Sequence, residues 1–177
     1  MRKLRIDSVV YFLIVLYGFD RFDVFIQLCI CYNDFETKNL RIRKFETQDA
    51  QQLYENHLEE KVKKWIPNES YADIEETRGA IGFYADCVNN KHLPFVLAVE
   101  LKENGELIGD TGINEVDGNS NEVEIGYTIC QKYRGNGYAT ELVQEMTKYT
   151  CEIFGVNILH GRVIWIFVYF RRIWCRG

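Results

Sequence analysis

The sequence lacks an apolar run long enough for a transmembrane helix, which needs about 20 residues. The first apolar stretch, Val9 to Phe19, follows a basic start as in a signal peptide, but no small-residue cleavage site follows it. A second apolar stretch spans Val24 to Tyr32. We therefore interpret residues 1–35 as an apolar N-terminal extension packed on the domain. A membrane-surface anchor within residues 1–33 is the alternative.

Paired Cys-x-x-Cys motifs are also absent, which argues against a zinc site. The six cysteines indicate free thiols in a reducing compartment, and hence a cytoplasmic protein. They are Cys29, Cys31, Cys87, Cys130, Cys151 and Cys175. Acidic residues crowd the turn at 117–121, but the spacing of an EF-hand is missing, so a solvated turn is the better interpretation. We predict no metal ion.

Basic residues are in the minority in the central part of the chain. Residues 36–163 contain 14 basic and 22 acidic side chains, and the whole chain has a formal net charge of −5. Nucleic-acid-binding domains carry the opposite balance, so nucleic acid is not expected as a partner. An acidic surface suits a cationic amine substrate, although the same charge also serves solubility.

The stretch from Glu122 to Val143 contains a strand, a glycine turn and a helix in succession. Residues 122–130 alternate with the two-residue period of a strand that has unlike faces. Apolar residues recur at helical spacing from 139 to 153, and Gly155 stands where a left-handed C-cap belongs. The turn between them reads Arg-Gly-Asn-Gly-Tyr, and its glycines let backbone amides turn toward one point at a helix N-terminus. This arrangement predicts an anion site suited to a pyrophosphate.

This stretch resembles the acetyl-CoA signature of the GNAT N-acetyltransferase superfamily. The resemblance rests on Glu-Ile-Gly-Tyr at 124–127 and on Arg-Gly-Asn-Gly-Tyr-Ala-Thr-Glu-Leu at 134–142. The Gly-Tyr-Ala-Thr-Glu part is most similar to the branch that acetylates ribosomal-protein N-termini and small amines. The family favours Gln or Arg where this chain has Lys132. Because backbone amides hold the phosphates, we expect this difference to matter little.

Two other interpretations of the glycine pair remain. A Rossmann dinucleotide site needs Gly-x-Gly-x-x-Gly, and position 140 is Thr. A plain glycine turn between a strand and a helix is the second alternative.

The resemblance implies an α+β fold with a mixed, mostly antiparallel sheet flanked by helices. It also implies acetyl-CoA as the co-substrate and an amine as the acceptor. The cofactor-binding residues that it implies are Thr128, Ile129, Cys130, Arg134, Gly135, Asn136, Gly137, Tyr138, Ala139 and Thr140. Among the backbone amides from 128 to 130, which would face the pantetheine and the thioester carbonyl, that of Ile129 is the best candidate. We interpret Cys130 as a small residue facing the pantetheine arm rather than as a nucleophile.

Acetyl transfer needs a neutral amine, yet lysine and α-amino groups are mostly protonated near pH 7. By resemblance, Glu124 is the candidate general base, acting directly or through water, and Glu122 is the weaker candidate. The alternative for Glu124 is a strand carboxylate that pairs with a neighbouring cation or orders the substrate. His57, His92 and His160 are scattered single residues, which we interpret as structural or solvated.

The expected GNAT domain covers residues 36–163. Its predicted elements are a strand at 39–45, a helix capped by Thr47, a helix capped by Ser70, a strand pair at 95–101 and 107–113, the signature strand and helix, and a strand from 157 to about 164. The two strands of the pair are joined at Asn104-Gly105, a hairpin turn signal.

No Asn, Ser, Asp or Glu follows residue 157, so the Asn-x-x-Ser and Glu-Lys-x-Gly-Phe segments of the family cannot be placed. We interpret residues 164–177 as an atypical basic and apolar tail and expect a sheet truncated after its fifth strand. A frameshifted or truncated reading frame is the hypothesis that explains this. An uncovered apolar strand edge favours self-association, so a homodimer is expected. The alternative function is a non-catalytic acetyl-CoA-binding module that has lost its acceptor side.

Overall fold

The computed structural model describes residues 34–60, 62, 70–116, 119–156 and 158–161. Within these ranges, no helix is long and apolar enough to cross a membrane. The predictions for residues 1–33, for the acidic turn at 117–118 and for the tail at 164–177 lie outside the described residues.

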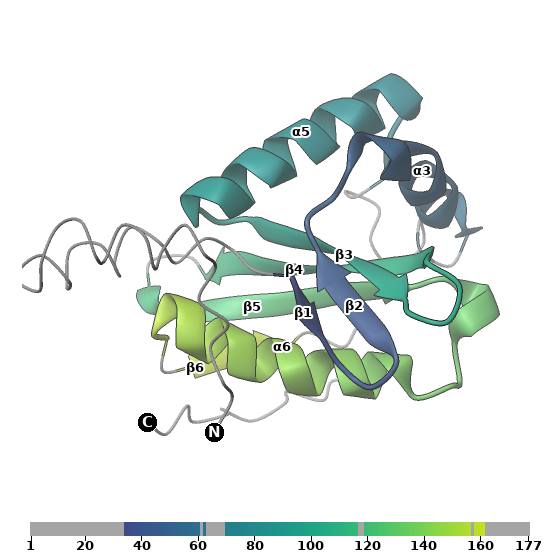
Figure 1. Cartoon of the computed structure of the whole chain (residues 1–177). Coiled ribbons are helices and arrows are strands. Elements are labelled where there is room, and N and C mark those ends of the chain that lie inside the picture. Colours follow the sequence, from purple (N-terminus) through teal and green to yellow (C-terminus); the bar gives the residue numbers. More distant parts are fainter. Residues whose placement is uncertain (1–33, 61, 63–69, 117–118, 157, 162–177) are drawn as a thin grey trace, which may run out of the picture. The chain divides into compact units, whose positions relative to one another are not determined.

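A six-stranded sheet forms the centre of the described domain (Figure 1). Its strands lie in chain order: β1 (Phe35–Glu36), β2 (Leu40–Arg43), β3 (Phe95–Leu101), β4 (Glu106–Val116), β5 (Asn119–Ile129) and β6 (Ile158–Gly161). Neighbouring strands are antiparallel except β5 and β6, which are parallel. The predicted mixed, mostly antiparallel sheet is therefore confirmed. It has one strand more than expected, because a strand of two residues such as β1 is too short to show a period.

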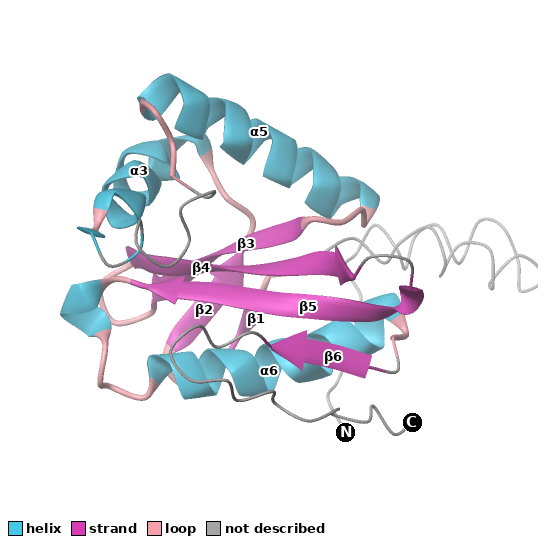
Figure 2. Cartoon of the chain, turned by 180° about the vertical axis from the view of Figure 1, so that it is seen from behind, coloured by secondary structure: helices cyan, strands magenta, loops and turns pink. Residues whose placement is uncertain are grey.

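Helices cover both faces of this sheet (Figures 1 and 2). Helices α3 (Ala50–Leu58) and α5 (Ile74–Asn90) lie on one face, and α6 (Tyr138–Phe154) lies on the other. Short 3-10 turns, η2 (Thr47–Asp49) and η4 (Gln131–Tyr133), precede α3 and follow β5. Beneath α3 and α5 the core contains Phe45, Ala50, Leu53, Ile81, Ala98 and Leu107. Because α6 crosses from the end of β5 to the start of β6, these two strands run parallel.

The C-cap of α6 agrees with the sequence prediction, whereas the N-cap of α5 differs from it. Gly155 ends α6 with a φ of 61°, and its amide donates to the Cys151 oxygen at 3.1 Å, so the predicted C-cap is confirmed. The predicted cap at Ser70 is wrong, because α5 begins after Asp73. The Asp73 side chain accepts a hydrogen bond from the Glu76 amide at 2.9 Å. Asp73 and Glu76 have the same spacing as Ser70 and Asp73, three residues later in the chain, and this later pair forms the cap.

Candidate active site

The glycine turn before α6 has a backbone that only glycine adopts readily. Gly135 and Gly137 have φ values of 83° and 84°, and Gly137 is the N-cap of α6. A glycine cap has no side chain that could bind the first amides of the helix, and the Glu141 amide is the one that reaches the Gly137 oxygen, at 3.1 Å. The amides of residues 138–140 therefore have no acceptor within the helix. This end of α6 is suited to binding an anion.

The space in front of the turn is open. A Cβ added to Gly135 or Gly137 would meet no heavy atom within 4 Å. The neighbouring polar side chains of the turn bind protein atoms instead. Arg134 Nε donates to the Ile129 oxygen at 2.6 Å and its Nη2 pairs with Glu59 at 3.0 Å, while Asn136 Nδ2 donates to the Tyr133 oxygen at 3.1 Å. These two predicted site residues shape the turn and leave its backbone amides for a ligand.

The hydrogen-bond alternation along β5 decides which of its amides face away from β4. The Cys130 amide donates to the Ile108 oxygen at 2.8 Å. Because hydrogen-bonded and non-bonded pairs alternate in an antiparallel ladder, the Thr128 amide also faces β4, opposite Asp110. The amides of Tyr127 and Ile129 therefore face the other way. Of the three amides predicted from sequence, that of Ile129 faces this edge, and the amide of Tyr127 faces it as well.

The described pairing on the edge of β5 that these two amides face covers part of the strand. β6 pairs with β5 from Glu122 to Ile125, where Gly161 lies opposite (Figure 2). In the described part of the chain, no strand pairs with residues 126–129 on that edge. An extended amide-bearing chain could add to β5 here by backbone hydrogen bonds.

The two candidate carboxylates on β5 have different surroundings. Glu122 pairs with His160, whose Nε2 lies 2.6 Å from Glu122 Oε2. Glu124 is half-buried and stands in register with Asn114 of β4 and His160 of β6. By strand alternation it shares a face with Gly126 and Thr128, the face that α3 and α5 cover. Glu124 thus lies on the side of β5 where a pocket opens.

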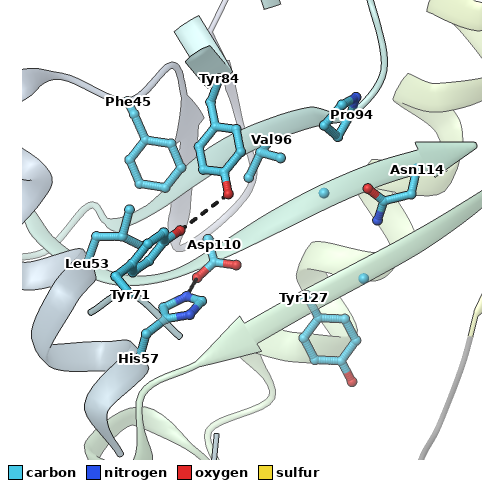
Figure 3. A pocket seen from close by; sticks show the side chains of 12 residues that line it. Phe45, Leu53, His57, Tyr71, Tyr84, Pro94, Val96, Asp110, Asn114 and Tyr127 are labelled. Atoms are coloured by element: carbon cyan, nitrogen blue, oxygen red, sulfur yellow. Dashed lines mark hydrogen bonds and ion pairs between the residues drawn. The ribbon is translucent and has the colours of Figure 1, made fainter. Parts of the chain in front are cut away.

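This pocket lies between the sheet and helices α3 and α5 (Figure 3). Its floor is the cross-strand pair Gly112 and Gly126, which have no side chains to fill it. Aromatic and aliphatic side chains form the walls, and the Tyr71 and Tyr84 hydroxyls lie 3.3 Å apart across one side. The empty volume is about 670 Å³, part of it open to solvent. The remaining lining residues are Phe45, Leu53, His57, Pro94, Val96, Asp110, Asn114 and Tyr127.

A buried polar cluster lies at one end of the pocket. Asp110 and His57 are 7% and 3% exposed, and His57 Nε2 lies 2.9 Å from Asp110 Oδ2. The Thr128 hydroxyl donates to the same oxygen. Of the two interpretations of His57, structural or solvated, the structural one holds, because its side chain is buried against Asp110.

Sequence reasoning missed this cluster because its members come from different elements. Helical spacing of the apolar residues favours Leu58 on the inward face of α3, but Leu58 is 38% exposed, and Asn56 and His57 are buried instead. Asp110 lies in a strand, and the alternation of apolar residues in that strand does not mark it as a site residue. The available signal was an aspartate within the strand at 107–113, where a buried charge needs a partner.

The described cysteines differ in their state. Cys87 and Cys130 are free and buried, whereas Cys151 forms a disulfide, so the prediction of free thiols is wrong for Cys151. Burial raises the pKa of Cys130 to about 12, and the charges of Glu59 and Asp110 add to this effect. The Cys130 thiol therefore stays protonated at neutral pH, which does not suit a nucleophile. Among the described residues, no group of three or more His, Cys, Asp or Glu could hold a metal ion.

The sequence from residue 39 to 167 matches the model of the acetyltransferase (GNAT) domain. The chain belongs to the GNAT acetyltransferase family. Curated relatives include the uncharacterized N-acetyltransferase p20 of Bacillus licheniformis, which is 29% identical over 72% of this chain and 71% of its own length. The uncharacterized N-acetyltransferase YoaA of Bacillus subtilis is 25% identical over 69% of this chain and 68% of its own.

Solved GNAT structures share the fold of this chain. An acetyltransferase of the GNAT family from Bacillus anthracis is 26% identical, with a TM-score of 0.59 over 73% of this chain and 72% of that chain. The ribosomal-protein-S5-alanine acetyltransferase from Vibrio fischeri has a TM-score of 0.63 over 73% of both chains. At 16% identity, this second likeness shows the fold alone.

Proposed function

We propose that the protein transfers an acetyl group from acetyl-CoA to a primary amine. The observation that carries the proposal is that the N-terminal end of α6 and the outward-facing amides of β5 follow one another along the same edge of β5. The glycine-capped end of α6 offers unpaired amides for a pyrophosphate, and β5 exposes the Ile129 and Tyr127 amides between that end and the pocket. An extended arm that starts at the turn passes Ile129 first and reaches Tyr127 beside Gly126.

The residues present fit acetyl-CoA. The positive-φ glycines leave open space where a phosphate would sit, and the Tyr127 and Ile129 amides face away from β4, where they could bind the pantetheine. When bound, acetyl-CoA supplies a thioester whose acetyl carbon an amine can attack. The Tyr127 amide is the donor nearest the pocket and would polarise the thioester oxygen, while the Ile129 amide would hold the arm. This extends the sequence prediction, which placed the oxyanion donor at Ile129.

Glu124 is the proposed general base. It lies two residues from Gly126 on the same face, roughly 7 Å along the strand, on the side where the amine would enter. Its carboxylate would take the proton that the ammonium must lose before attack. Glu122 suits this role less well because it lies two residues further from Gly126 along β5.

The finer assignment to the ribosomal-protein-acetylating branch rests on the Gly-Tyr-Ala-Thr-Glu run at 137–141. Fold neighbours described as ribosomal-protein acetyltransferases, from Vibrio cholerae and Vibrio fischeri, are consistent with it. Their acceptors belong to those proteins, and a protein N-terminus and a small amine are both candidate acceptors for this chain.

The test combines binding and turnover. Calorimetric titration with CoA should give a saturable signal, and acetyl-CoA with a panel of amines and N-terminal peptides should release free thiol in an amine-dependent way. Binding without amine-dependent release would favour the non-catalytic module. Absence of both would refute the cofactor assignment.

A further inference from the structure

The pocket contains one carboxylate oxygen that the proposed reaction does not use. Asp110 is 7% exposed, and its Oδ2 contacts both His57 and Thr128. Its Oδ1 contacts neither of them and points into the space toward Asn114 and Tyr127 (Figure 3). Asp110 is one of the residues that line the pocket, so this oxygen lies at the pocket wall. A carboxylate oxygen in such a position favours a ligand that donates a hydrogen bond.

We propose that this pocket is the acceptor site and that it takes a compact primary amine with an apolar body and a second hydrogen-bond donor, bound by Asp110 Oδ1. The inference rests on the proposed acetyl transfer and names its substrate class. The second donor is a hydroxyl or an ammonium group, since either can donate to a carboxylate.

The positions of the two carboxylates assign the two ends of the substrate. Gly126 lies beside the outward-facing Tyr127 amide, so the reacting amine sits over Gly126 and next to Glu124. Asp110 is paired with Thr128, two residues further along β5 in the opposite direction from Glu124. Since two residues span roughly 7 Å of strand, one nitrogen cannot occupy both ends. Asp110 therefore binds a different group of the same molecule.

The walls between these ends are apolar and closely packed. The Tyr71 ring lies 5.2 Å from that of His57, the Tyr84 ring lies 6.1 Å from that of Phe45, and the two tyrosine hydroxyls meet. Val96 lies beside the glycine floor, where its Cγ2 would be 3.6 Å from a Cβ at Gly112. A pocket with such walls suits a small molecule rather than an extended peptide.

In the reaction, the ammonium gives its proton to Glu124, and the neutral nitrogen forms a C–N bond with the acetyl carbon. The C–S bond breaks, the nitrogen loses its second proton to solvent to give the neutral amide, and the departing thiolate takes a proton from solvent. Asp110 forms no bond with the reacting atoms. It is a binding residue, and His57 and Thr128 hold its carboxylate in place.

The experiment compares matched amines that differ in the second donor. Tyramine is compared with 2-phenylethylamine, and 1,5-diaminopentane with 1-aminopentane, by thiol release from acetyl-CoA. The first pair tests a hydroxyl and the second an ammonium. In the wild type, the donor-bearing member of at least one pair should have the higher kcat/KM, by about tenfold or more. In Asp110→Asn, which turns an acceptor oxygen into a donor, this ratio should fall to about one.

A second variant keeps the proposal testable if Asp110→Asn does not fold. A Cβ at Gly126 meets no atom within 4 Å, so Gly126→Leu would fill the pocket without displacing the sheet. It should lower kcat/KM for all four amines by at least tenfold while CoA titration remains unchanged. Gly79→Leu is the matched control, because Gly79 is exposed on α5 and its Cβ also meets nothing within 4 Å.

Four results would overturn the inference. An unchanged donor preference in a folded Asp110→Asn variant would exclude Asp110 as the binding residue. Unchanged amine kinetics in Gly126→Leu would exclude this pocket as the acceptor site. Acetylation of N-terminal peptides but none of the four amines would leave acetyl transfer standing and refute the substrate class. Absence of CoA binding and of any thiol release would refute the proposed function, and this inference with it.

Discussion

At the scale of single residues, the proposed cofactor site consists mainly of backbone amides. Gly135 and Gly137 have positive φ values, and the amides that follow them have no acceptor inside α6. On β5, the parity of the ladder turns the amides of Tyr127 and Ile129 outward. Gly109 allows β4 and β5 to approach each other closely at this point, because a Cβ there would lie 2.1 Å from the Thr128 oxygen. Side-chain chemistry is concentrated in the pocket, at Glu124 and Asp110.

Replacing Gly137 with Glu should abolish CoA binding, because the carboxylate would lie at the anion site. The φ of 84° means that any side chain strains the backbone, by about 1–3 kcal/mol, so some loss of stability is expected. Gly137→Ala carries the same strain without the charge and is the matched control. Calorimetry should give at least a tenfold weaker CoA affinity for the Glu variant than for the Ala variant. Equal affinities in folded proteins would remove the anion site from this turn.

Replacing Glu124 with Gln should lower turnover more than it lowers affinity. A general base contributes about 10²–10⁴-fold, so kcat should fall within that range while KM for acetyl-CoA changes little. The acid limb of the pH–rate profile should flatten, because Gln cannot titrate. A variant with full activity between pH 6 and 9 would show that Glu124 is not the base.

At the scale of elements, Glu141 joins the start of α6 to the turn between β1 and β2. Its carboxylate accepts hydrogen bonds from the Thr37 hydroxyl, from the Asn39 amide at 2.7 Å and from Asn39 Nδ2 at 2.7 Å. Burial alone would raise the pKa of Glu141, but these hydrogen bonds outweigh it and hold the pKa below 4.5. The ionised carboxylate is thus the form that stabilises the fold.

Replacing Glu141 with Gln should lower the free energy of unfolding by about 1.5–3 kcal/mol at pH 7, since a charged acceptor is lost and an amide faces Asn39 Nδ2. Because the folded-state pKa is depressed, this stabilisation is present above pH 4.5 and is lost as pH falls through the folded-state value. Urea unfolding at pH 7 and below pH 4 measures both effects. Glu152→Gln, at an exposed position of α6, is the control. An equal acid response in wild type and Glu141→Gln would contradict the assignment.

At the scale of the whole molecule, the family match ends at residue 167. The last ten residues, 168–177, contain Phe, Val, Tyr, Ile and Trp and no acidic residue, a composition that favours self-association. We predict that the chain self-associates and that a variant lacking 168–177 does so less, with unchanged CoA affinity. Light scattering after size-exclusion chromatography and CoA titration test this. A monomeric full-length protein whose activity disappears on deletion would show instead that these residues serve the enzyme.

The sequence determined the local features of this protein. These features are the alternation of β5, the glycine cap of α6 and the C-cap at Gly155. Each depends on residues within a few positions of one another, so the spacing of those residues in the sequence predicts it. The signature at 124–142 predicted the family through the same short stretch. The Ser70 cap was misplaced because two equivalent signals lie three residues apart, and local spacing does not rank them.

Only the tertiary structure decided how the site is assembled. His57 and Asp110 are 53 residues apart, and their pairing depends on how α3 is rotated over β4. The outward direction of the Tyr127 and Ile129 amides depends on the register between β4 and β5, which a one-residue slip would reverse. Burial then determines the position of the Asp110 carboxylate, because a carboxylate is buried only where other chain segments supply its hydrogen bonds.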